Sequence, residues 1–313
     1  GSTGDWDWET AFVTSKATSD DVTSNRMSNN LLKEALNDAT AAAYNPFSAN
    51  NYATNIERTL IDVYRKGSSE LTMFDFKMSN NELWTLPAGD VGLLLGFELR
   101  DEEMDDDRDP RLDGTITYTD YEGDTYPLVA DVLNSSPTGD VSGSRDVTSF
   151  FAELQIPVAE SVDMQVAVRN EDFSDFGDTT KGKIAFRWQA LENIAFRGAF
   201  STGFKAPTLG QSNVRNVTTA FGTGGQLIDR ATLPPTDPVS QLKGGEQLTP
   251  EESESITFGV VADFDNGLFI TADYYNIELT DRISTASGIA LTEEDIATLL
   301  AQGISDASSF SEI

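Results

Sequence analysis

The chain has 313 residues, of which 52 are acidic and 21 basic, and the resulting net charge of −31 argues against nucleic acid as a partner because the phosphates would be repelled. The absence of cysteine and histidine excludes thiol catalysis, disulfides, histidine bases and nearly all zinc or copper chemistry. No stretch approaches 18 uninterrupted apolar residues, so the sequence predicts no transmembrane helix.

Alternating apolar and polar residues predict about nine β-strands along the chain. Two weaker runs come first, DWDWETAFV near the start and LTMFDFKMS at 71–79. The clearest run, DVGLLLGFELR, places the apolar residues at 91, 93, 95, 97 and 99 on one side, with Glu98 and Arg100 on the other. Six further runs of this kind lie at 146–156, 162–171, 183–190, 194–205, 255–264 and 267–275.

This pattern fits either a half-buried soluble sheet or the wall of a transmembrane β-barrel. The runs hold roughly 9–13 residues, close to the 9–11 that a tilted strand needs to cross a bilayer and longer than the usual 5–6. No ionised residue interrupts the middle of any apolar face, where Lys or Arg against lipid would cost about 2–4 kcal/mol. Strand length and charge placement together favour the membrane wall.

The connections between the runs are of two kinds. Tight connections are predicted at 157–161, 191–193 and 265–267, and the connection 174–181, although short, is predicted on the same rim as the long ones. Long connections are predicted at about 15–68, 102–145, 206–250 and 283–313. Short turns on one rim and long loops on the other are typical of outer-membrane barrels. The four tryptophans fall at or near the short rim, as in an interfacial aromatic belt.

The sequence therefore predicts an all-β fold, namely part of an antiparallel transmembrane β-barrel. The expected shape is an incomplete, curved meander sheet with long extracellular loops that carry short helices, all within a single barrel domain over residues 1–313. Thr54 and Glu57 form a capping-box pair that predicts a loop helix ending at Gly67. Thr292 predicts the start of a second loop helix, which ends at Gly303.

Few residues of the predicted loops suggest a metal-binding, phosphate-binding or catalytic site. Asp105, Asp107 and Asp109 have the D-x-D-x-D spacing of a calcium loop, but Pro110 stands where glycine is required and no distal glutamate follows. A solvated acidic loop is therefore the favoured interpretation. The glycine-rich segment 220–227 follows no strand-to-helix turn, which argues against a phosphate site. Because no acid, base and nucleophile come together, neither an enzymatic activity nor a cofactor is predicted.

Three segments resemble a known family. FRGAFSTGFKAPTLGQ resembles the Gly-Phe-Arg-Ala-Pro strand exit of the outer-membrane TonB-dependent receptors, with lysine in place of arginine. LTPEESESITFGVV resembles the family's Pro-Glu-x-Ser strand start, and LFITADYYNIELTDRIS its Asp-Tyr-Tyr…Asp-Arg-Ile strand. Earlier segments from YNPFSA onwards follow the family's order, so the resemblance covers most of 40–313. The matching residues are Gly203, Phe204, Lys205, Ala206, Pro207, Pro250, Glu251, Ser253, Asp273, Tyr274, Tyr275, Asp281 and Arg282.

The resemblance implies a receptor in the outer membrane of a Gram-negative bacterium. Such a receptor takes up a scarce solute, such as an iron chelate, cobalamin, a glycan or a peptide, with energy delivered by TonB. The implied partners are outer-membrane lipid, a small solute, and TonB through an N-terminal part that this chain lacks. The family pairs a barrel of roughly 22 strands with a plug. About nine strands cannot close such a barrel, so we expect a portion without plug or final strands that forms no closed monomeric barrel.

Strand parity predicts that Arg169, Arg187, Arg197 and Lys205 face the lumen, where each could equally be an ordinary wall charge paired with a neighbouring acid. Phe204 is expected at the outer interface. Pro207, which lacks an N–H, would end the ladder where the chain leaves the sheet.

Two alternatives remain open. The first is a passive porin with the same wall and no plug, and the second is a soluble extracellular β-sandwich that serves as an adhesin or sugar-binding module. The row containing Phe97, Phe186 and Phe258 separates the membrane wall from the sandwich, because lipid would cover it in the wall and a second protein layer in the sandwich.

Overall fold

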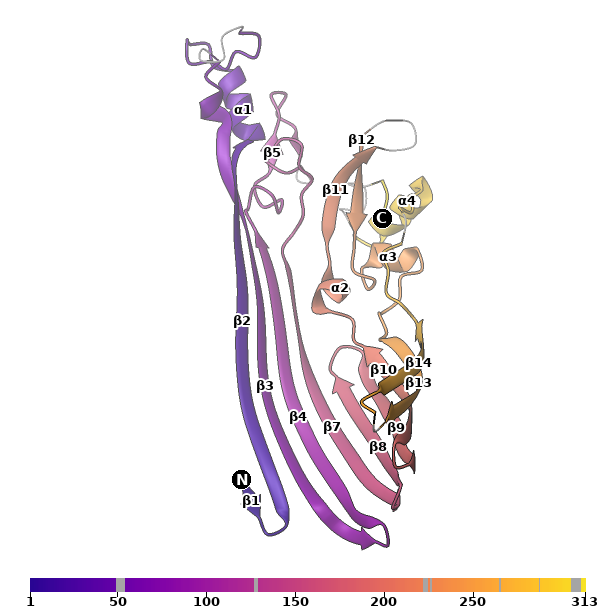
Figure 1. Cartoon of the computed structure of the whole chain (residues 1–313). Helices are drawn as coiled ribbons and strands as arrows, with labels where there is room; N and C mark the ends of the chain where they lie inside the picture. Colours follow the sequence, from indigo (N-terminus) through magenta and orange to yellow (C-terminus); the bar gives the residue numbers. More distant parts are fainter. Residues whose placement is uncertain are drawn as a thin grey trace.

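The structure is a computed structural model, and it describes residues 1–48, 54–126, 129–221, 225, 227–264, 266–286, 288–304 and 311–313. Its main element is one antiparallel sheet of ten strands, drawn from indigo to orange in Figure 1. The strand order is β1-β2-β3-β4-β7-β8-β9-β10-β13-β14, a meander. In the described segments β14 does not pair back with β1 or β2, so the sheet is open. The predicted incomplete meander is confirmed.

The bounds of the sheet strands are β1 (Ser2–Thr3), β2 (Trp6–Met27), β3 (Leu60–Leu86), β4 (Gly89–Arg108), β7 (Val141–Ala159), β8 (Val162–Phe173), β9 (Gly177–Leu191), β10 (Ile194–Lys205), β13 (Glu251–Asp263) and β14 (Phe269–Thr280). The connections carry two hairpins, β5 (Tyr118–Thr119) with β6 (Thr125–Tyr126) and β11 (Asn216–Phe221) with β12 (Leu227–Thr232). They also carry α1 (Asn29–Leu36), the 3-10 turn η2 (Ile56–Thr59), α2 (Leu209–Asn213), α3 (Pro238–Leu242) and α4 (Glu293–Ala301). None of the helices in these segments is long and apolar enough to span a bilayer.

The first long strands extend further than the sequence predicts. β2 and β3 run deep into the predicted loop 15–68, and β4 and β7 shorten the predicted loop 102–145 from both sides. Apart from the first residues of β3, which are partly apolar, these extensions are polar on both faces and show no alternation. Their ladders continue nevertheless, because backbone hydrogen bonding needs no apolar side chain. The predicted loops 206–250 and 283–313 agree with the ends of β10 and β14.

The loop helix predicted from Thr54 to Gly67 is wrong. Only the short turn η2 forms, after which Leu60 begins β3. Ile61 and Val63 are β-branched and lie opposite residues of β2. The cross-strand ladder therefore outweighs the helical spacing of the apolar residues.

The second predicted loop helix is confirmed. The Thr292 hydroxyl accepts a hydrogen bond from the Asp295 backbone N–H at 3.2 Å, and the Asp295 side chain accepts one in return from the Thr292 N–H at 2.7 Å. This reciprocal pair is a capping box. Gly303 follows α4 with a φ of 86°, a left-handed conformation that glycine adopts without strain.

The two faces of the sheet have opposite chemistry. We call the face that carries Phe97, Phe186 and Phe258 the apolar face, and the face that carries Glu98 and Arg100 the charged face. On the apolar face Phe186 is 43% and Phe258 50% exposed. No described segment forms a second layer over it (Figure 1). The β-sandwich alternative is therefore wrong, because a sandwich buries one face of each sheet.

The two ends of the sheet also differ. The tight turns lie together at the bottom of Figure 1, and the long connections lie together at the top. Trp8, Trp84 and Trp188 lie in β2, β3 and β9 close to the tight turns, and each is nearly half exposed. Trp6 begins β2 beside them, so the tryptophans lie at the short rim as expected, and their role as an interfacial belt stays a prediction.

Candidate functional site

The first two long connections are joined by a buried carboxylate. Asp131 is fully buried and accepts hydrogen bonds from the Ser28 hydroxyl at 2.8 and 2.9 Å and from the Asn30 backbone N–H at 2.9 Å. Arg111 forms an ion pair with it at 2.6 Å. Because Ser28 is the N-cap of α1, the positive end of that helix also faces this carboxylate. Asp131 therefore fixes α1 against the β4–β7 connection.

The β4–β7 connection in turn contacts the β11–β12 hairpin. The Ser136 hydroxyl donates to Asp229 Oδ1 at 2.6 Å, and the Thr138 hydroxyl accepts from the Val217 N–H at 3.1 Å. Residues far apart in the sequence are thus tied together above the sheet. The long connections form one assembly, which we call the loop assembly.

The last two long connections share a small hydrophobic core. Its buried members are Ala231, Leu233, Val239 and Leu299, with Val217, Leu291, Ile304 and Ile313 packed around them. An ion pair between Lys243 and Asp295 lies beside this core. The Lys243 ammonium, together with hydrogen bonds from Thr292, lowers the pKa of Asp295 to about 2. The loop assembly is therefore a packed unit with its own internal contacts.

Two cavities lie in the loop assembly. One, of about 740 Å³, lies between the upper ends of β2, β3 and β4 and the segment 210–216, and its lining includes Arg65 and Arg108. The other, of about 660 Å³, lies between the segment 230–248 and the segment 283–289. Both volumes fall within the range of small-molecule pockets. They are the candidate places for a solute.

The motif residues around the exit of β10 meet those at the start of β13. Gly203 lies directly opposite Ser253, and Lys205 directly opposite Glu251. A Cβ atom on Gly203 would come within 2.6 Å of the Ser253 hydroxyl, so any other residue there would force that hydroxyl to turn away. Glu251 also accepts a hydrogen bond from the Ile283 N–H at 3.0 Å. The motifs thus fasten three chain segments at the base of the loop assembly.

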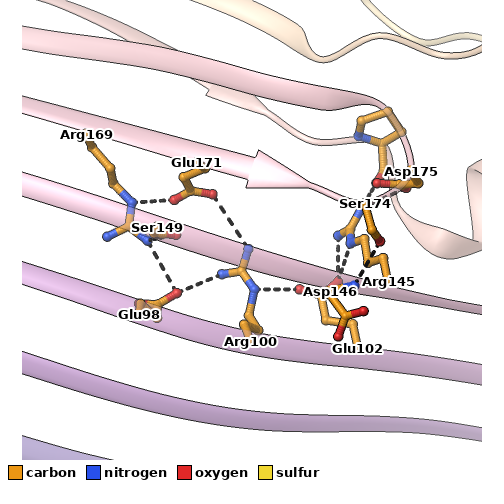
Figure 2. Close-up of polar contacts among 11 residues, drawn as sticks. Glu98, Arg100, Glu102, Arg145, Asp146, Ser149, Arg169, Glu171, Ser174 and Asp175 are labelled. Atoms are coloured by element: carbon orange, nitrogen blue, oxygen red, sulfur yellow. Dashed lines mark hydrogen bonds and ion pairs between the residues drawn. The ribbon is translucent and has the colours of Figure 1, made fainter.

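Arg145 of β7 fastens the same region to the wall. Its side chain is 8% exposed and donates to the Pro207 carbonyl oxygen at 2.6 Å and to Glu102 at 2.8 Å (Figure 2). The guanidinium lies 5.3 Å from the centre of the Phe173 ring. Phe204, near the end of β10, is half-buried and lies edge-on to that same ring, and its expected place at the outer interface stays a prediction. Arg145 therefore holds Pro207, two residues beyond the end of β10.

Arg145 belongs to a network of alternating charges across β4, β7 and β8 (Figure 2). Arg100 lies 2.9 Å from Glu102 and 3.3 Å from Glu98, and Arg169 contacts both Glu98 and Glu171. Charged groups this poorly hydrated are stable when each has opposite charges beside it. The network therefore stiffens the charged face just below the loop assembly.

The four predicted lumen cations all lie on strands of the sheet, but in different settings. Arg169 is part of the network, whereas Arg197 forms a two-pronged ion pair with Asp273 of β14 at 2.7 and 2.9 Å. Lys205 lies 3.6 Å from Glu251. Arg187 donates to Gln189 and has no ion-pair partner among the described residues. Whether any of them touches a solute stays a prediction.

The remaining motif residues lie along and after β14. Tyr274 faces Phe258 across the strands and is 63% exposed, while Tyr275 has the opposite parity. Asp281 follows the strand with a φ of 53°, and Arg282 comes next on the surface. These residues mark the place where the chain turns from the sheet into the loop assembly.

The structure does not bring Asp105, Asp107 and Asp109 together. The first two lie within β4, where successive side chains point to opposite faces and alternate ones stand apart along the strand. The close carboxylates in the described segments are Asp120, Glu122 and Asp124, in the turn between β5 and β6. The Asp120 carboxylate stabilises this turn, since it accepts hydrogen bonds from the backbone N–H groups of Glu122 and Asp124.

Sequence reasoning did not single out Arg145, Phe173 or Pro207 as one contact. Because Arg145 lies within the predicted loop 102–145, neither a strand nor a face of the sheet was predicted for it. Arg145 directly precedes the alternating run 146–156 and has the same parity as Val147, which was the available signal.

Comparison with known proteins decides the family. The family model described as "TonB dependent receptor-like, beta-barrel" matches residues 1–294. The chain belongs to this family. Its members are receptors of the Gram-negative outer membrane and not enzymes. A search of the curated proteins gives no match.

Solved structures resemble this TonB-dependent receptor wall in fold. The RagAB peptide importer in its "closed-closed" state matches with a TM-score of 0.51 and 13% identity, over 88% of this chain and 28% of that one. The siderophore receptor PirA from Acinetobacter baumannii matches with a TM-score of 0.49 and 14% identity, over 74% of this chain and 34% of that one. A mutant ferric enterobactin receptor, PfeA, from Pseudomonas aeruginosa gives 0.42 and 19%, over 74% and 37%. The chain thus spans about a third of the length of these proteins.

Proposed function

We propose that this chain is part of the wall and outer loops of a receptor that imports a scarce solute across the outer membrane with energy from TonB. The carrying observation is the contrast between the two faces of one sheet. The apolar face is uncovered, as it would be against lipid, while the charged face holds the network of Arg100, Arg145 and Arg169. A polar lumen behind a lipid-facing wall is the arrangement of outer-membrane barrels.

The loop assembly is the proposed solute-binding region. It lies at the end opposite the tight turns, which are periplasmic in outer-membrane barrels (Figure 1). It contains both large cavities and is fastened to the wall at Pro207 and Glu251. Iron chelates, cobalamin, glycans and peptides remain the candidate solutes. A plug and a TonB-contacting segment would come from the rest of the receptor.

Topology can be tested by cysteine labelling, because the chain has no cysteine of its own. Tyr121 is 77% exposed in the β4–β7 connection, and Glu192 lies in the tight turn between β9 and β10. In intact cells that express the full-length receptor, a membrane-impermeant maleimide should label Tyr121→Cys. Glu192→Cys should react only after the outer membrane is permeabilised. Equal labelling of both in intact cells would contradict the proposed orientation.

Energised import needs a separate measurement. Cells with and without TonB are given ferric chelates, cobalamin, oligosaccharides and peptides, and uptake that depends on the receptor is compared. We expect receptor-dependent uptake of one class to disappear without TonB. Uptake that persists without TonB would instead support the passive porin.

A further inference from the structure

One side of the cavity between the segments 230–248 and 283–289 is main chain that is fixed at both ends. The Ile283 N–H donates to Glu251 at 3.0 Å, and Ile289 and Ile313 exchange two backbone hydrogen bonds at 2.6 and 2.9 Å. Residues 284–286 and 288 lie between these anchors and line the cavity. Their backbone N–H and C=O groups form no hydrogen bond with any residue that the structure describes. The cavity therefore offers a row of free main-chain donors and acceptors.

The cations that line this cavity are already paired. Arg230 donates from two nitrogens to Glu312, at 2.5 and 2.8 Å. Lys243 forms its ion pair with Asp295 at 2.5 Å. Glu246 also lines the cavity, is exposed, and has no ion-pair partner in the described part of the chain. The uncompensated charge of the cavity is therefore negative, which repels an anionic chelate and attracts an ammonium group.

The rest of the lining is aliphatic or carries hydroxyl groups. Leu233, Leu248 and Ile313 supply apolar surface, and hydroxyls come from Thr232 and Ser240. The described residues of the lining include no phenylalanine, tyrosine or tryptophan, so an aromatic chelator finds no ring on which to stack. A solute with aliphatic groups and amides matches this lining better than a flat or anionic one.

A peptide in an extended conformation has the pattern that complements the free main chain. Each of its residues offers one N–H donor and one C=O acceptor, with a rise of about 3.3 Å per residue. Proteins bind extended peptides by pairing them with free main chain, while pockets for alternate side chains provide selectivity. Because the segment 283–289 is held at both ends before a solute arrives, binding costs it little conformational entropy.

We propose that this cavity binds a short peptide in an extended conformation, with its main chain along residues 284–286 and 288 and its terminal ammonium group beside Glu246. The inference rests on the proposed function, since it names the class of solute that the receptor imports. The volume of about 660 Å³ suits a ligand of a few residues. Peptides with a free amino end and uncharged side chains are the expected solutes, and anionic iron chelates are excluded.

The test measures peptide binding to the purified full-length receptor in detergent. The receptor is equilibrated with a mixture of synthetic pentapeptides of alanine, valine, leucine and serine, unbound peptide is removed, and the bound peptides are quantified by mass spectrometry. N-acetylated counterparts should be retained about fivefold less than unblocked peptides, as for the loss of one partly exposed ion pair. Glu246→Gln should lower retention of unblocked peptides to the acetylated level and leave acetylated peptides unaffected. Glu122→Gln, which neutralises another exposed carboxylate of the loop assembly, should change neither.

Proline substitutions test the contribution of the main chain. In an extended segment successive N–H groups point to opposite sides, so only one of Ser284→Pro and Thr285→Pro removes a donor that faces the peptide. That variant should retain about fivefold less of both peptide sets, and the other should bind as the unaltered receptor does. Equal effects of the two prolines would overturn the proposal, as would a Glu246→Gln receptor that still prefers unblocked peptides.

Uptake by cells separates a failure of this site from a failure of the proposed function. TonB-dependent uptake of an iron chelate or an oligosaccharide, by a receptor that retains no peptide, would overturn this inference alone. Retention of unblocked peptide without TonB-dependent uptake of any solute class would support the site and overturn the proposed function.

Discussion

The two faces of the sheet are built by the same strands and yet reverse the usual relation between polarity and burial. On the apolar face, large rings such as Phe150 and Phe258 are half exposed or more. On the charged face, Arg145 and Glu171 have side chains less than a tenth exposed. A water-soluble sheet would bury the rings and expose the charges. The reversal is what the proposed location predicts, with lipid outside this wall and polar groups in the space behind it.

The largest effect is expected from placing a charge on the wrong face. Phe258→Arg puts a guanidinium against hydrocarbon and should reduce the free energy of unfolding in lipid vesicles by about 2–4 kcal/mol. Thr257→Arg, one residue away on the charged face, should change it far less. Urea titration of both variants in the full-length receptor measures the difference. Equal losses would show that the two faces meet the same solvent.

Removing a central cation of the charged face is expected to have the next largest effect. Arg145→Met leaves the Pro207 carbonyl without its donor and removes one of the two cations beside Glu102, and it should cost about 1–3 kcal/mol. Protease cleavage within 206–250 in intact cells should also become faster, because the base of the loop assembly is released. Arg187→Met is the matched control, since Arg187 has no ion pair in the described segments. Unchanged cleavage in Arg145→Met would contradict the fastening role.

The loop assembly and the wall should differ in their response to acid. The pKa of Asp295 is lowered from its usual 3.8 to about 2, chiefly by the Lys243 ammonium. Its stabilising contribution is therefore complete above about pH 4 and is lost as the pH falls through about 2. A fluorophore on Leu300→Cys should show increased mobility over that range, while one on the wall at Phe150→Cys should not. In Asp295→Asn the mobility should be raised already at neutral pH, with no further acid transition from this group.

The smallest effect is expected for an exposed pair on the charged face. Arg197 and Asp273 are each about half exposed although their contact is two-pronged. Water and salt screen such a pair, so Arg197→Met should destabilise the wall less than Arg145→Met. The loss should shrink further in high salt. If urea titration showed a loss of unfolding free energy as large as that of Arg145→Met, the contribution of a cation on the charged face would not depend on its burial.

Much of the fold could be predicted from the alternation of apolar and polar residues. The strands, their apolar faces, the tight turns and the family motifs were all visible, because the period-two pattern and the turn residues are local features. The polar upper parts of β2, β3 and β4 were not visible. Most of their residues are polar on both faces, so they show no period-two pattern. They form strands because each pairs with a neighbouring strand of the sheet. For the same reason the apolar spacing around Ile61 predicted a helix that does not form.

The contacts of the candidate site also divide into those that the sequence motifs indicate and those that they do not. The pairing of Gly203 with Ser253 and of Lys205 with Glu251 joins two motifs that the sequence already marks, whereas the contact of Arg145 with Pro207 joins a marked residue to an unmarked one. The sequence by itself determined which side chains share the apolar face, since that depends on parity along each strand. Only the tertiary structure decided which charges and loops meet one another, because strand register and loop packing bring together residues whose separation along the chain carries no local signal.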